Sequence, residues 1–292
     1  MTTDRFEFGE NWAKFLSVVD EDRIRVAVAS VQAITGRQRM DGLRFLDIGS
    51  GSGLFSLAAR RLGADVVSFD YDKHSVECTR EIKRRYAPDD PHWRVESGSV
   101  LDPAFLSTLG TFDIVYSWGV LHHTGSMWPA IENAIGRVAQ GGTFSIALYN
   151  YQPKWTPRWT AIKKMYLRLP AWLRPLYTAA MMAPHELPSM VRHPIRQYRF
   201  IKEYGHARGM SYWRDLVDWV GGYPFEAATP QQVVDFCRER GFLLFFLTTD
   251  GAGWGCNQFG FVQAASAAGR GTDRAQAAAA SGESLRAVAV DH

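Results

Sequence analysis

A glycine-rich stretch between an apolar run and a helical pattern most constrains how this chain can fold. The residues FLDIGSGSGLFS (45–56) overlap the end of a predicted strand, Leu43–Asp47, and lead into a helical pattern over Leu54–Leu62. Backbone that turns sharply and lacks side chains lets a ligand lie against its N–H groups. The stretch therefore predicts an α/β fold with a ligand at the first strand-to-helix turn.

Strand and helix patterns alternate over the first half of the chain. Further strands are predicted at Asp65–Phe69, Trp93–Ser97, Phe112–Ser117 and Thr143–Tyr149. Further helices are predicted over His74–Tyr86 and Trp128–Ala139, and the second of these has one buried face at Ile131, Ala134, Ile135 and Val138. Such alternation predicts a doubly wound, Rossmann-like parallel sheet with helices on both faces.

The alternation stops at Asn150 and resumes near Thr229. In TPQQVVDFCRERG, Thr229 suits a helix N-cap, Pro230 the first helical position and Gln232 a capping box. Two β-like runs follow, FLLFFLTTD and CNQFGFVQA, joined by GAGWG, which suits an antiparallel pair at the sheet edge. The predicted fold is a sheet of seven strands with an antiparallel edge strand and a helical cap inserted after the fifth strand.

These patterns divide the chain into four parts. Residues 37–150 and 227–264 form the predicted sheet domain, and residues 151–226 the cap. Residues 1–36 contain two predicted helices, about Gly9–Val19 and Asp20–Thr35. The aromatic side chains near the start (Phe6, Phe8, Trp12 and Phe15) favour a lid over the ligand, although ordinary packing explains them too. Residues 265–292 are rich in Ala, Gly and Ser without aromatics, which predicts a disordered tail.

Composition narrows the class of protein. With 292 residues, 46% of them hydrophobic, the chain can bury one large core. Its three cysteines form no C-x-x-C pair, so neither a disulfide framework nor a metal site is expected. No apolar run reaches about 18 residues and the N-terminus lacks a signal-peptide layout, so we expect a cytoplasmic protein.

The positive charge is concentrated in the predicted cap. Residues 151–215 hold twelve Lys or Arg against three Asp or Glu, although the net charge of the whole chain is only +3. Three explanations stay open: a cap with a solvated basic face, an amphipathic surface that rests on an anionic membrane, or an RNA-binding face. We favour the first, and nucleic acid is the least favoured partner. The oligomeric state is not predicted.

Acidic residues at two strand ends indicate which ligand the glycine turn accepts. The glycines are spaced Gly49-x-Gly51-x-Gly53, and Asp47 precedes them by two residues. A carboxylate there would repel a dinucleotide pyrophosphate but suits a ligand with ammonium and sulfonium groups. Asp70, seventeen residues beyond Gly53, ends the second strand where a carboxylate can accept both hydroxyls of a ribose.

Two later segments complete a pattern. ESGSVLD ends the third strand, and FDIVYSWGVLHHT is a fourth strand that runs out into a loop. With the first two strand ends, they resemble motifs I to IV of the class I S-adenosylmethionine-dependent methyltransferases, in the branch that includes quinone-biosynthesis methylases. The resemblance covers about residues 40–150 and 229–264. It implies a methyltransferase with S-adenosylmethionine as its cofactor.

The resemblance also implies roles for individual residues around the cofactor. Asp70 would hold the ribose, Tyr71 or Val100 would flank the adenine, and Ser99 stands where many relatives have an aspartate. Trp118 and Gly119 would line the channel beside the methyl group, and Asn11 and Trp12 would reach the cofactor from the lid. The methionine part would lie among Asp47, Gly49, Ser50, Gly51 and Gly53.

The acceptor decides which catalytic residues are needed. An alcohol must lose a proton to a base, whereas a thioether has none to lose. Candidate bases are His122, His123 and Glu226, with Asp215 and Asp218 as further candidates, and the expected substrate contacts are Trp118, Arg208, Arg214 and Tyr223.

We expect a small-molecule acceptor with a hydroxyl oxygen favoured, and sulfur or amine acceptors stay open. The basic cap would also suit an anionic substrate, with Arg208 or Arg214 as its partner. Alternatives are an RNA methyltransferase, a membrane-associated lipid or quinol methyltransferase that uses the basic insert, and a cofactor-binding module without catalysis.

Overall fold

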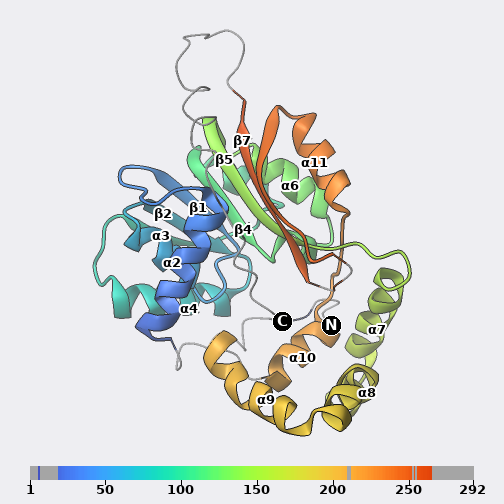
Figure 1. The fold of residues 1–292 in the computed structure, drawn as a ribbon. Coiled ribbons are helices and arrows are strands. Elements are labelled where there is room, and N and C mark those ends of the chain that lie inside the picture. The colour runs from blue at the N-terminus through green and yellow to red at the C-terminus, as the bar shows by residue number, and fades with distance from the viewer. Residues whose placement is uncertain (1–5, 7–18, 209–211, 252, 254, 265–292) are drawn as a thin grey trace, which may run out of the picture.

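A computed structural model describes residues 6, 19–208, 212–251, 253 and 255–264, and shows one mixed sheet covered by helices (Figure 1). The strand order is β3-β2-β1-β4-β5-β7-β6. Five strands are parallel, and β7 runs antiparallel to both β5 and β6. The strands are β1 (Arg44–Ile48), β2 (Asp65–Asp70), β3 (Trp93–Ser97), β4 (Phe112–Trp118), β5 (Val138–Tyr149), β6 (Phe242–Thr248) and β7 (Cys256–Gln263). The predicted fold class is confirmed, with β7 next to the edge and β6 forming it.

Helices cover both faces of the sheet, and the sheet separates two layers of buried side chains. One face carries α2 (Glu21–Thr35), α3 (Leu54–Arg61) and α4 (Lys73–Tyr86), and the other carries α5 (Pro103–Ser107), α6 (Met127–Ile135) and α11 (Pro230–Arg238). Because side chains alternate along a strand, Phe45 of β1 packs in the first layer whereas Leu46 packs in the second. α11 begins at the predicted capping box of Thr229 and Gln232.

The described part of the predicted lid lies on the sheet. α2 buries Ile24, Ala27, Val31 and Ile34, and the Ser145 hydroxyl of β5 donates to the carbonyl of Ile34 at 3.4 Å. Phe6 donates its backbone N–H to Tyr223 of the cap at 2.8 Å. The remainder of the predicted lid, with Asn11 and Trp12, lies outside the described residues, as does the predicted tail.

One predicted helix end was wrong. α6 stops at Ile135, and Val138 begins β5, where it pairs with Phe112 of β4. Val138 is buried in the same layer as the apolar face of α6, which is why its spacing fitted a helix. The turn between them is tight, because Arg137 donates its N–H to the carbonyl of Ala134 at 3.0 Å.

The predicted cap consists of helices with a small core of their own. α7 (Thr156–Arg168), α8 (Arg174–Arg192), α9 (Pro194–Arg208) and α10 (Tyr212–Gly221) follow β5 as an arc at one end of the molecule (Figure 1). α7, α8 and α10 share a core that contains Trp159, Tyr166, Met182, Val220 and Phe225. Within the described part of the chain, none of the helices is both long enough and apolar enough to cross a membrane.

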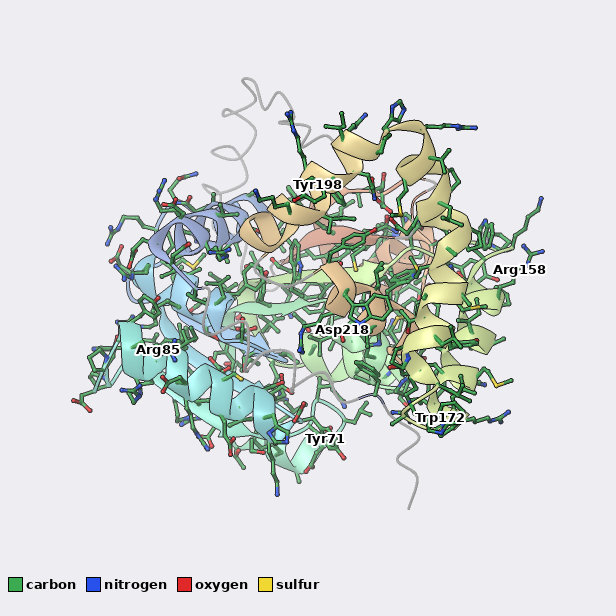
Figure 2. The ribbon with its side chains drawn as sticks, turned by 90° about the horizontal axis from the view of Figure 1, so that it is seen from below. Tyr71, Arg85, Arg158, Trp172, Tyr198 and Asp218 are labelled. Atoms are coloured by element: carbon green, nitrogen blue, oxygen red, sulfur yellow. The ribbon has the colours of Figure 1, made fainter. Side chains whose placement is uncertain are left out.

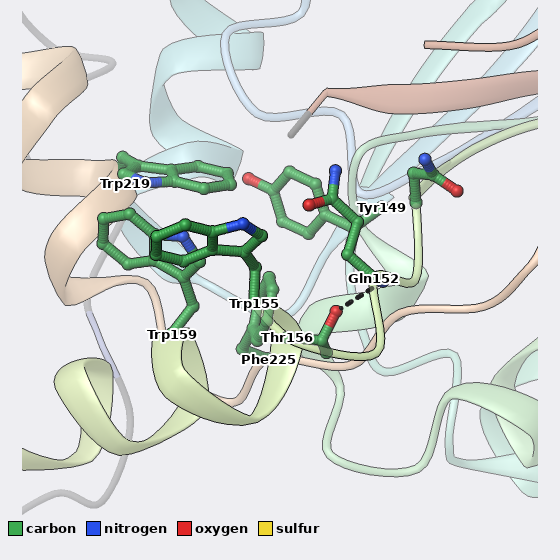
Figure 3. A pocket seen from close by; sticks show the side chains of 8 residues that line it. Tyr149, Gln152, Trp155, Thr156, Trp159, Trp219 and Phe225 are labelled. Atoms are coloured by element: carbon green, nitrogen blue, oxygen red, sulfur yellow. Dashed lines mark hydrogen bonds between the residues drawn. The ribbon is translucent and has the colours of Figure 1, made fainter. Parts of the chain in front are cut away.

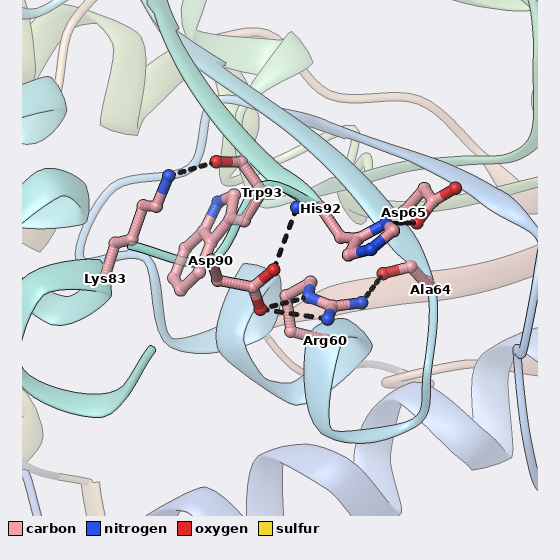
Figure 4. Close-up of polar contacts among 7 residues, drawn as sticks. All are labelled: Arg60, Ala64, Asp65, Lys83, Asp90, His92 and Trp93. Atoms are coloured by element: carbon pink, nitrogen blue, oxygen red, sulfur yellow. Dashed lines mark hydrogen bonds and ion pairs between the residues drawn. The ribbon is translucent and has the colours of Figure 1, made fainter. Parts of the chain in front are cut away.

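The amino ends of β2 and β3 are closed by a local polar network (Figure 4). Asp90 accepts from the Arg60 side chain at 2.9 Å and from the backbone N–H of His92 at 2.8 Å. The His92 ring lies 2.7 Å from Asp65. These groups hold α3 and the β3 loop together, so polar side chains at this edge have structural partners.

A substitution at Gly53 tests whether α3 and α4 pack too closely to admit a side chain. Its φ is +83°, and a Cβ there would lie 2.8 Å from the Thr79 Cα of α4. We expect Gly53→Ala to lower the free energy of unfolding by about 2–4 kcal/mol, from backbone strain and a contact that backbone atoms cannot relieve. Gly42→Ala is the matched control, since Gly42 has φ +72° and open space, and we expect it to cost about 1 kcal/mol. Urea unfolding measures both, and equal losses would contradict the packing role.

Candidate active site

The loops that follow the first four strands meet at one edge of the sheet. The turn at 49–53 follows β1, residues 71 and 72 follow β2, residues 98–100 follow β3, and residues 119 and 120 follow β4. β1 lies between β2 and β4, so the chain order reverses at this point. Ligands of open α/β sheets bind at the carboxyl edge beside such a reversal.

The carboxylate of Asp70 is held in place by two backbone groups. One oxygen accepts from Gly51 N–H at 3.0 Å and the other from Asp72 N–H at 2.9 Å. The turn itself is fastened to β2, because Gly49 and Ser50 both donate to the carbonyl of Phe69, at 2.8 and 3.1 Å. Each carboxylate oxygen can accept more than one hydrogen bond, so the pair suits two neighbouring hydroxyls.

The glycines of the first turn differ in what their missing side chains allow. A Cβ on Gly49 would lie 2.4 Å from a methyl of Val120, and one on Gly53 would meet α4. These two glycines therefore permit close packing between protein segments. Gly51 supplies its N–H to Asp70, and the Ser50 hydroxyl pairs with that of Thr79 at 2.8 Å.

Space that a ligand can enter lies instead beside the backbone of Gly119, after β4. Its φ is +72°, and no heavy atom lies within 4 Å of the place a Cβ would take. The neighbouring Trp118 ring is stacked on the Tyr116 ring, with 6.0 Å between ring centroids, and lies 5.7 Å from the centroid of the Phe55 ring. Trp118 is thus partly packed on the core, next to the open space at Gly119.

Asp47 is a buried acid in the middle of the site. Its carboxylate accepts from the Ser56 hydroxyl at 2.5 Å and is only 3% exposed. Burial raises the pKa of Asp47 to about 7; the Ser56 hydrogen bond opposes this and the charge of Asp70 adds to it. The hydroxyl of Tyr116, on the neighbouring strand, is buried without a hydrogen-bond partner among the described residues.

The residues predicted to surround the adenine differ in exposure. Tyr71 is 62% exposed, whereas Val100 is buried in the sheet core and its carbonyl accepts from Asn133 at 2.9 Å. The Ser99 hydroxyl accepts from the N–H of Leu101 at 3.1 Å. Tyr71 is therefore the apolar surface that a planar ring can reach at this position.

His122 and His123 form a contacting pair with different tautomers. His122 is fully buried, and its Nδ1 accepts from the backbone N–H of Tyr149 at 3.2 Å, which leaves the ring proton on Nε2. Burial, then the charges of His123 and Lys163, hold the pKa of His122 well below its usual value. In His123, Nδ1 donates to the Pro224 carbonyl at 2.6 Å, so Nε2 is the nitrogen with the lone pair.

Glu226, in the segment between α10 and α11, places its side chain at the N-terminus of α6. Its carboxylate accepts from the N–H of Met127 at 2.9 Å, and its own N–H donates to the carbonyl of His122 at 2.9 Å. Burial raises the pKa of Glu226, against hydrogen bonds from the backbone at Met127 and Gly125. The side chain therefore stabilises a helix N-terminus, and the backbone N–H holds the loop of the histidines.

A pocket lined by aromatic rings lies where β5 meets the cap (Figure 3). The Tyr149 ring lies 4.0 Å from the His122 ring and 5.5 Å from the His123 ring, centroid to centroid. The pocket is lined by Tyr149, Asn150, Gln152, Trp155, Thr156, Trp159, Trp219 and Phe225. No sequence pattern was used to predict this pocket, although Trp155 at the N-cap of α7 and Trp159 in its first turn stand at i, i+4 spacing.

Lys163, one turn after Trp159, is a second residue that the sequence analysis missed. It is fully buried, donates to the Trp219 carbonyl, and lies 4.6 and 4.7 Å from the ring centroids of Trp219 and Phe225. Burial lowers the pKa of Lys163 to about 7, against the charge of Asp218. The ammonium group thus fixes two walls of the pocket from behind.

The remaining predicted substrate residues lie elsewhere in the cap. Tyr223 packs with the cap core, and Lys164 lies 5.5 Å from its ring centroid. Arg214 lies on α10 and does not line the aromatic pocket. Arg208 ends α9, and its side chain lies outside the described part of the chain. The structure brings His122 and His123 near the pocket, whereas Tyr223 and Arg214 do not line it.

A family model described as a methyltransferase domain matches residues 19–185. The chain belongs to this family. It is of the class I, S-adenosylmethionine-dependent kind. The ubiquinone biosynthesis O-methyltransferase of Paramagnetospirillum magneticum is 32% identical over 115 residues, which are 39% of this chain and 43% of the relative. That of Sinorhizobium medicae is 30% identical over 128 residues, or 44% and 50%. The match thus spans about half the length of these curated relatives.

Solved structures share the fold of this methyltransferase. The magnesium protoporphyrin IX methyltransferase of Synechocystis PCC 6803 with bound SAH gives a TM-score of 0.51 at 14% identity, over 84% of this chain and 89% of that one. An O-methyltransferase family protein from Burkholderia thailandensis gives 0.50 at 12% identity, over 85% and 56%. At this identity they establish the architecture alone.

The described residues fit the cofactor of this family. Asp70 is an oriented carboxylate that would suit a ribose, Gly119 leaves backbone open to a ligand, and Asp47 is a buried acid whose charge a cation would stabilise. The Tyr116 hydroxyl is a buried donor that a ligand or water can satisfy.

Removing the Asp70 carboxylate should weaken cofactor binding. We expect Asp70→Ala to reduce the affinity for S-adenosylmethionine more than tenfold, about 1.4 kcal/mol or above, because charge-assisted hydrogen bonds to the ribose are lost. Isothermal titration calorimetry measures this directly. Asp72→Ala removes a neighbouring carboxylate that caps α4, so it controls for local stability. Unchanged affinity in Asp70→Ala would contradict the assignment.

The raised pKa of Asp47 predicts a pH-dependent affinity. A cationic ligand favours the ionised carboxylate, which predominates only above about pH 7 in the protein alone. Affinity for the cofactor should therefore rise about tenfold from pH 6 to pH 8. Asp47→Asn should bind more weakly and lose this dependence.

The same substitution should stabilise the protein without ligand. The pKa of Asp47 is higher in the folded chain than its value of 3.8 when unfolded, so its ionisation disfavours folding increasingly as pH rises from about 4 to 7. At pH 8, Asp47→Asn should melt at a higher temperature than the wild type. A lower melting temperature together with pH-independent wild-type affinity would refute the electrostatic role.

Proposed function

We propose that this protein transfers the methyl group of S-adenosylmethionine to a small-molecule acceptor, with a hydroxyl oxygen favoured. The observation that carries the proposal is the aromatic pocket at the end of β5. Its Tyr149 ring lines the pocket and also contacts the rings of His122 and His123. The residues at 37–150 and 227–264 would bind the cofactor, and those at 151–226 would cover the acceptor.

The chemistry of the residues that line the pocket supports a small acceptor. Small-molecule sites are concave and mostly apolar, with a few polar groups that fix orientation. Here aromatic rings form the walls, while Asn150, Gln152 and Thr156 add polar atoms. The curated relatives are ubiquinone biosynthesis O-methyltransferases, which supports an oxygen acceptor.

The cofactor supplies a methyl group on a sulfonium, an activated leaving group that needs no acid. The protein must therefore position the acceptor and, for an alcohol or phenol, remove its proton. His123 is the better placed of the two histidines for that step, because the Pro224 carbonyl fixes its proton on Nδ1 and Nε2 carries the lone pair. His122 would act as a donor from Nε2 and hold the Tyr149 backbone.

Glu226 and the cationic residues would act indirectly. Glu226 holds the loop that carries both histidines, through the hydrogen bond from its N–H to the His122 carbonyl. The Lys163 ammonium behind the Trp219 wall would attract an acceptor with a carboxylate or phosphate, although Asp218 offsets part of its charge. Arg214 stays a proposed partner for such an anion.

Transfer of labelled methyl groups tests the proposed function. The protein is incubated with methyl-labelled S-adenosylmethionine and cell extract separated into metabolite, lipid and RNA fractions. We expect label in a small molecule from the metabolite or lipid fraction, on an oxygen atom. Label in RNA, or cofactor binding without transfer to any fraction, would overturn the proposal and favour an RNA methyltransferase or a non-catalytic module.

His123→Asn should separate catalysis from binding. Loss of a general base typically costs about 10²- to 10⁴-fold in kcat for a hydroxyl acceptor, while the affinity for cofactor should stay within about twofold because no cofactor contact is assigned to His123. Acceptor analogues with more acidic hydroxyls should reduce the defect. Wild-type turnover, or a defect that is the same for every analogue, would exclude His123 as the base.

A further inference from the structure

The outer face of the cap exposes large apolar side chains in an ordered row. Val191 is 77% exposed, Trp172 76% and Ile195 71%, and neighbouring helix positions continue the row. We call this the outer face and define it by Trp172, Leu176, Leu187, Val191, Ile195 and Tyr198. On α8, Leu176, Leu187 and Val191 recur at helical spacings, so this helix presents one apolar stripe, and α9 adds Ile195 and Tyr198 at i, i+3 spacing.

The outer face is separate from the core of the cap. Met182 and Thr178 of α8 are buried on its other side, with Met182 in the same core as Trp159, which lines the aromatic pocket. α8 and α9 form the end of the molecule farthest from the sheet in Figure 1. Figure 2 views this end from below, with Trp172 near the start of α8 and Tyr198 on α9.

Cations are interspersed with the apolar stripe. Arg192, Arg196, Arg199 and Lys202 are all exposed on the same two helices. Among the side chains that the structure describes there, the only acid is Glu186, which accepts from Gln197 at 3.0 Å. A face that is simply solvated would not expose so many large apolar groups, since soluble proteins rarely leave such contiguous patches.

We propose that the outer face docks this protein on an anionic lipid bilayer. The apolar side chains would enter the boundary between headgroups and acyl chains, and the arginines and lysine would pair with anionic headgroups. Two copies of this face would place like charges against each other, which disfavours self-association. An RNA backbone would satisfy the cations but leave the aliphatic row exposed.

Docking on a bilayer has a consequence for the acceptor. α8, which would touch lipid on one side, helps build on its other side the core that supports the aromatic pocket. An acceptor dissolved in the membrane would then reach the pocket from the lipid side. This consequence rests on the proposed function, whereas docking itself does not.

Flotation with lipid vesicles tests the docking. The full chain is mixed with vesicles of phosphatidylcholine alone, or of phosphatidylcholine with phosphatidylglycerol, and separated on a density gradient. We expect the protein to float with the anionic vesicles and to stay behind with the uncharged ones. Equal partition to both compositions, or flotation with neither, would overturn the proposal.

Substitutions identify the face responsible. The double variant Leu187→Asp, Val191→Asp should lose more than tenfold of the partition, and each of Arg192→Gln, Arg196→Gln and Arg199→Gln should lower it about fivefold. The matched control is Val26→Asp, which adds a carboxylate at a residue 68% exposed on α2 and should float as the wild type does. A double variant that floats normally would refute the assignment.

Two further readouts keep the result interpretable. Each variant should bind S-adenosylmethionine with wild-type affinity by calorimetry, which shows that it is folded and separates failed docking from a failed proposed function. Analytical ultracentrifugation without vesicles should give the same mass for wild type and double variant. A wild-type dimer that the substitutions convert to a monomer would assign the outer face to contacts between copies and overturn lipid docking.

Discussion

The site depends first on one carboxylate held by the backbone. Asp70 ends β2, and its two oxygens accept from the N–H groups of Gly51 and Asp72. These hydrogen bonds join the loops after β1 and β2, so the turn, the acid and the start of α4 form one rigid edge. A ligand that uses this carboxylate meets a group whose orientation is already set, and loses little free energy in ordering it.

Two other buried groups, one at this edge and one in the cap, are arranged at some cost to stability. Asp47 is buried with a raised pKa, and Lys163 is buried with a lowered one, so both oppose folding when charged. Neither is needed to complete the hydrophobic layers of the sheet. Their positions, beside the expected sulfonium and behind the aromatic pocket, suggest that burial of charge serves the chemistry rather than the fold.

The sequence predicted the sheet and its motifs well because these depend on local patterns. Strand and helix periodicity, the capping box at Thr229 and the strand-end acids each lie within short segments. The aromatic pocket depends on contacts between Tyr149, α7 and α10, which lie far apart in the chain, so no local pattern indicated it. The end of α6 was mispredicted for a related reason. Val138 is buried against the same core as α6, so its position fitted the helical spacing although it belongs to the strand that follows.

The contact between Gly49 and Val120 has an evolutionary consequence. A methyl of Val120 occupies the place where any larger residue at position 49 would put its Cβ. Drift at these two positions is therefore coupled: a chain that gains a side chain at 49 must lose bulk at 120. Because Val120 lies two residues before His122, such a compensated change would also shift the histidine loop. Acceptor preference could then diverge between homologues through a pair of positions that do not line the aromatic pocket.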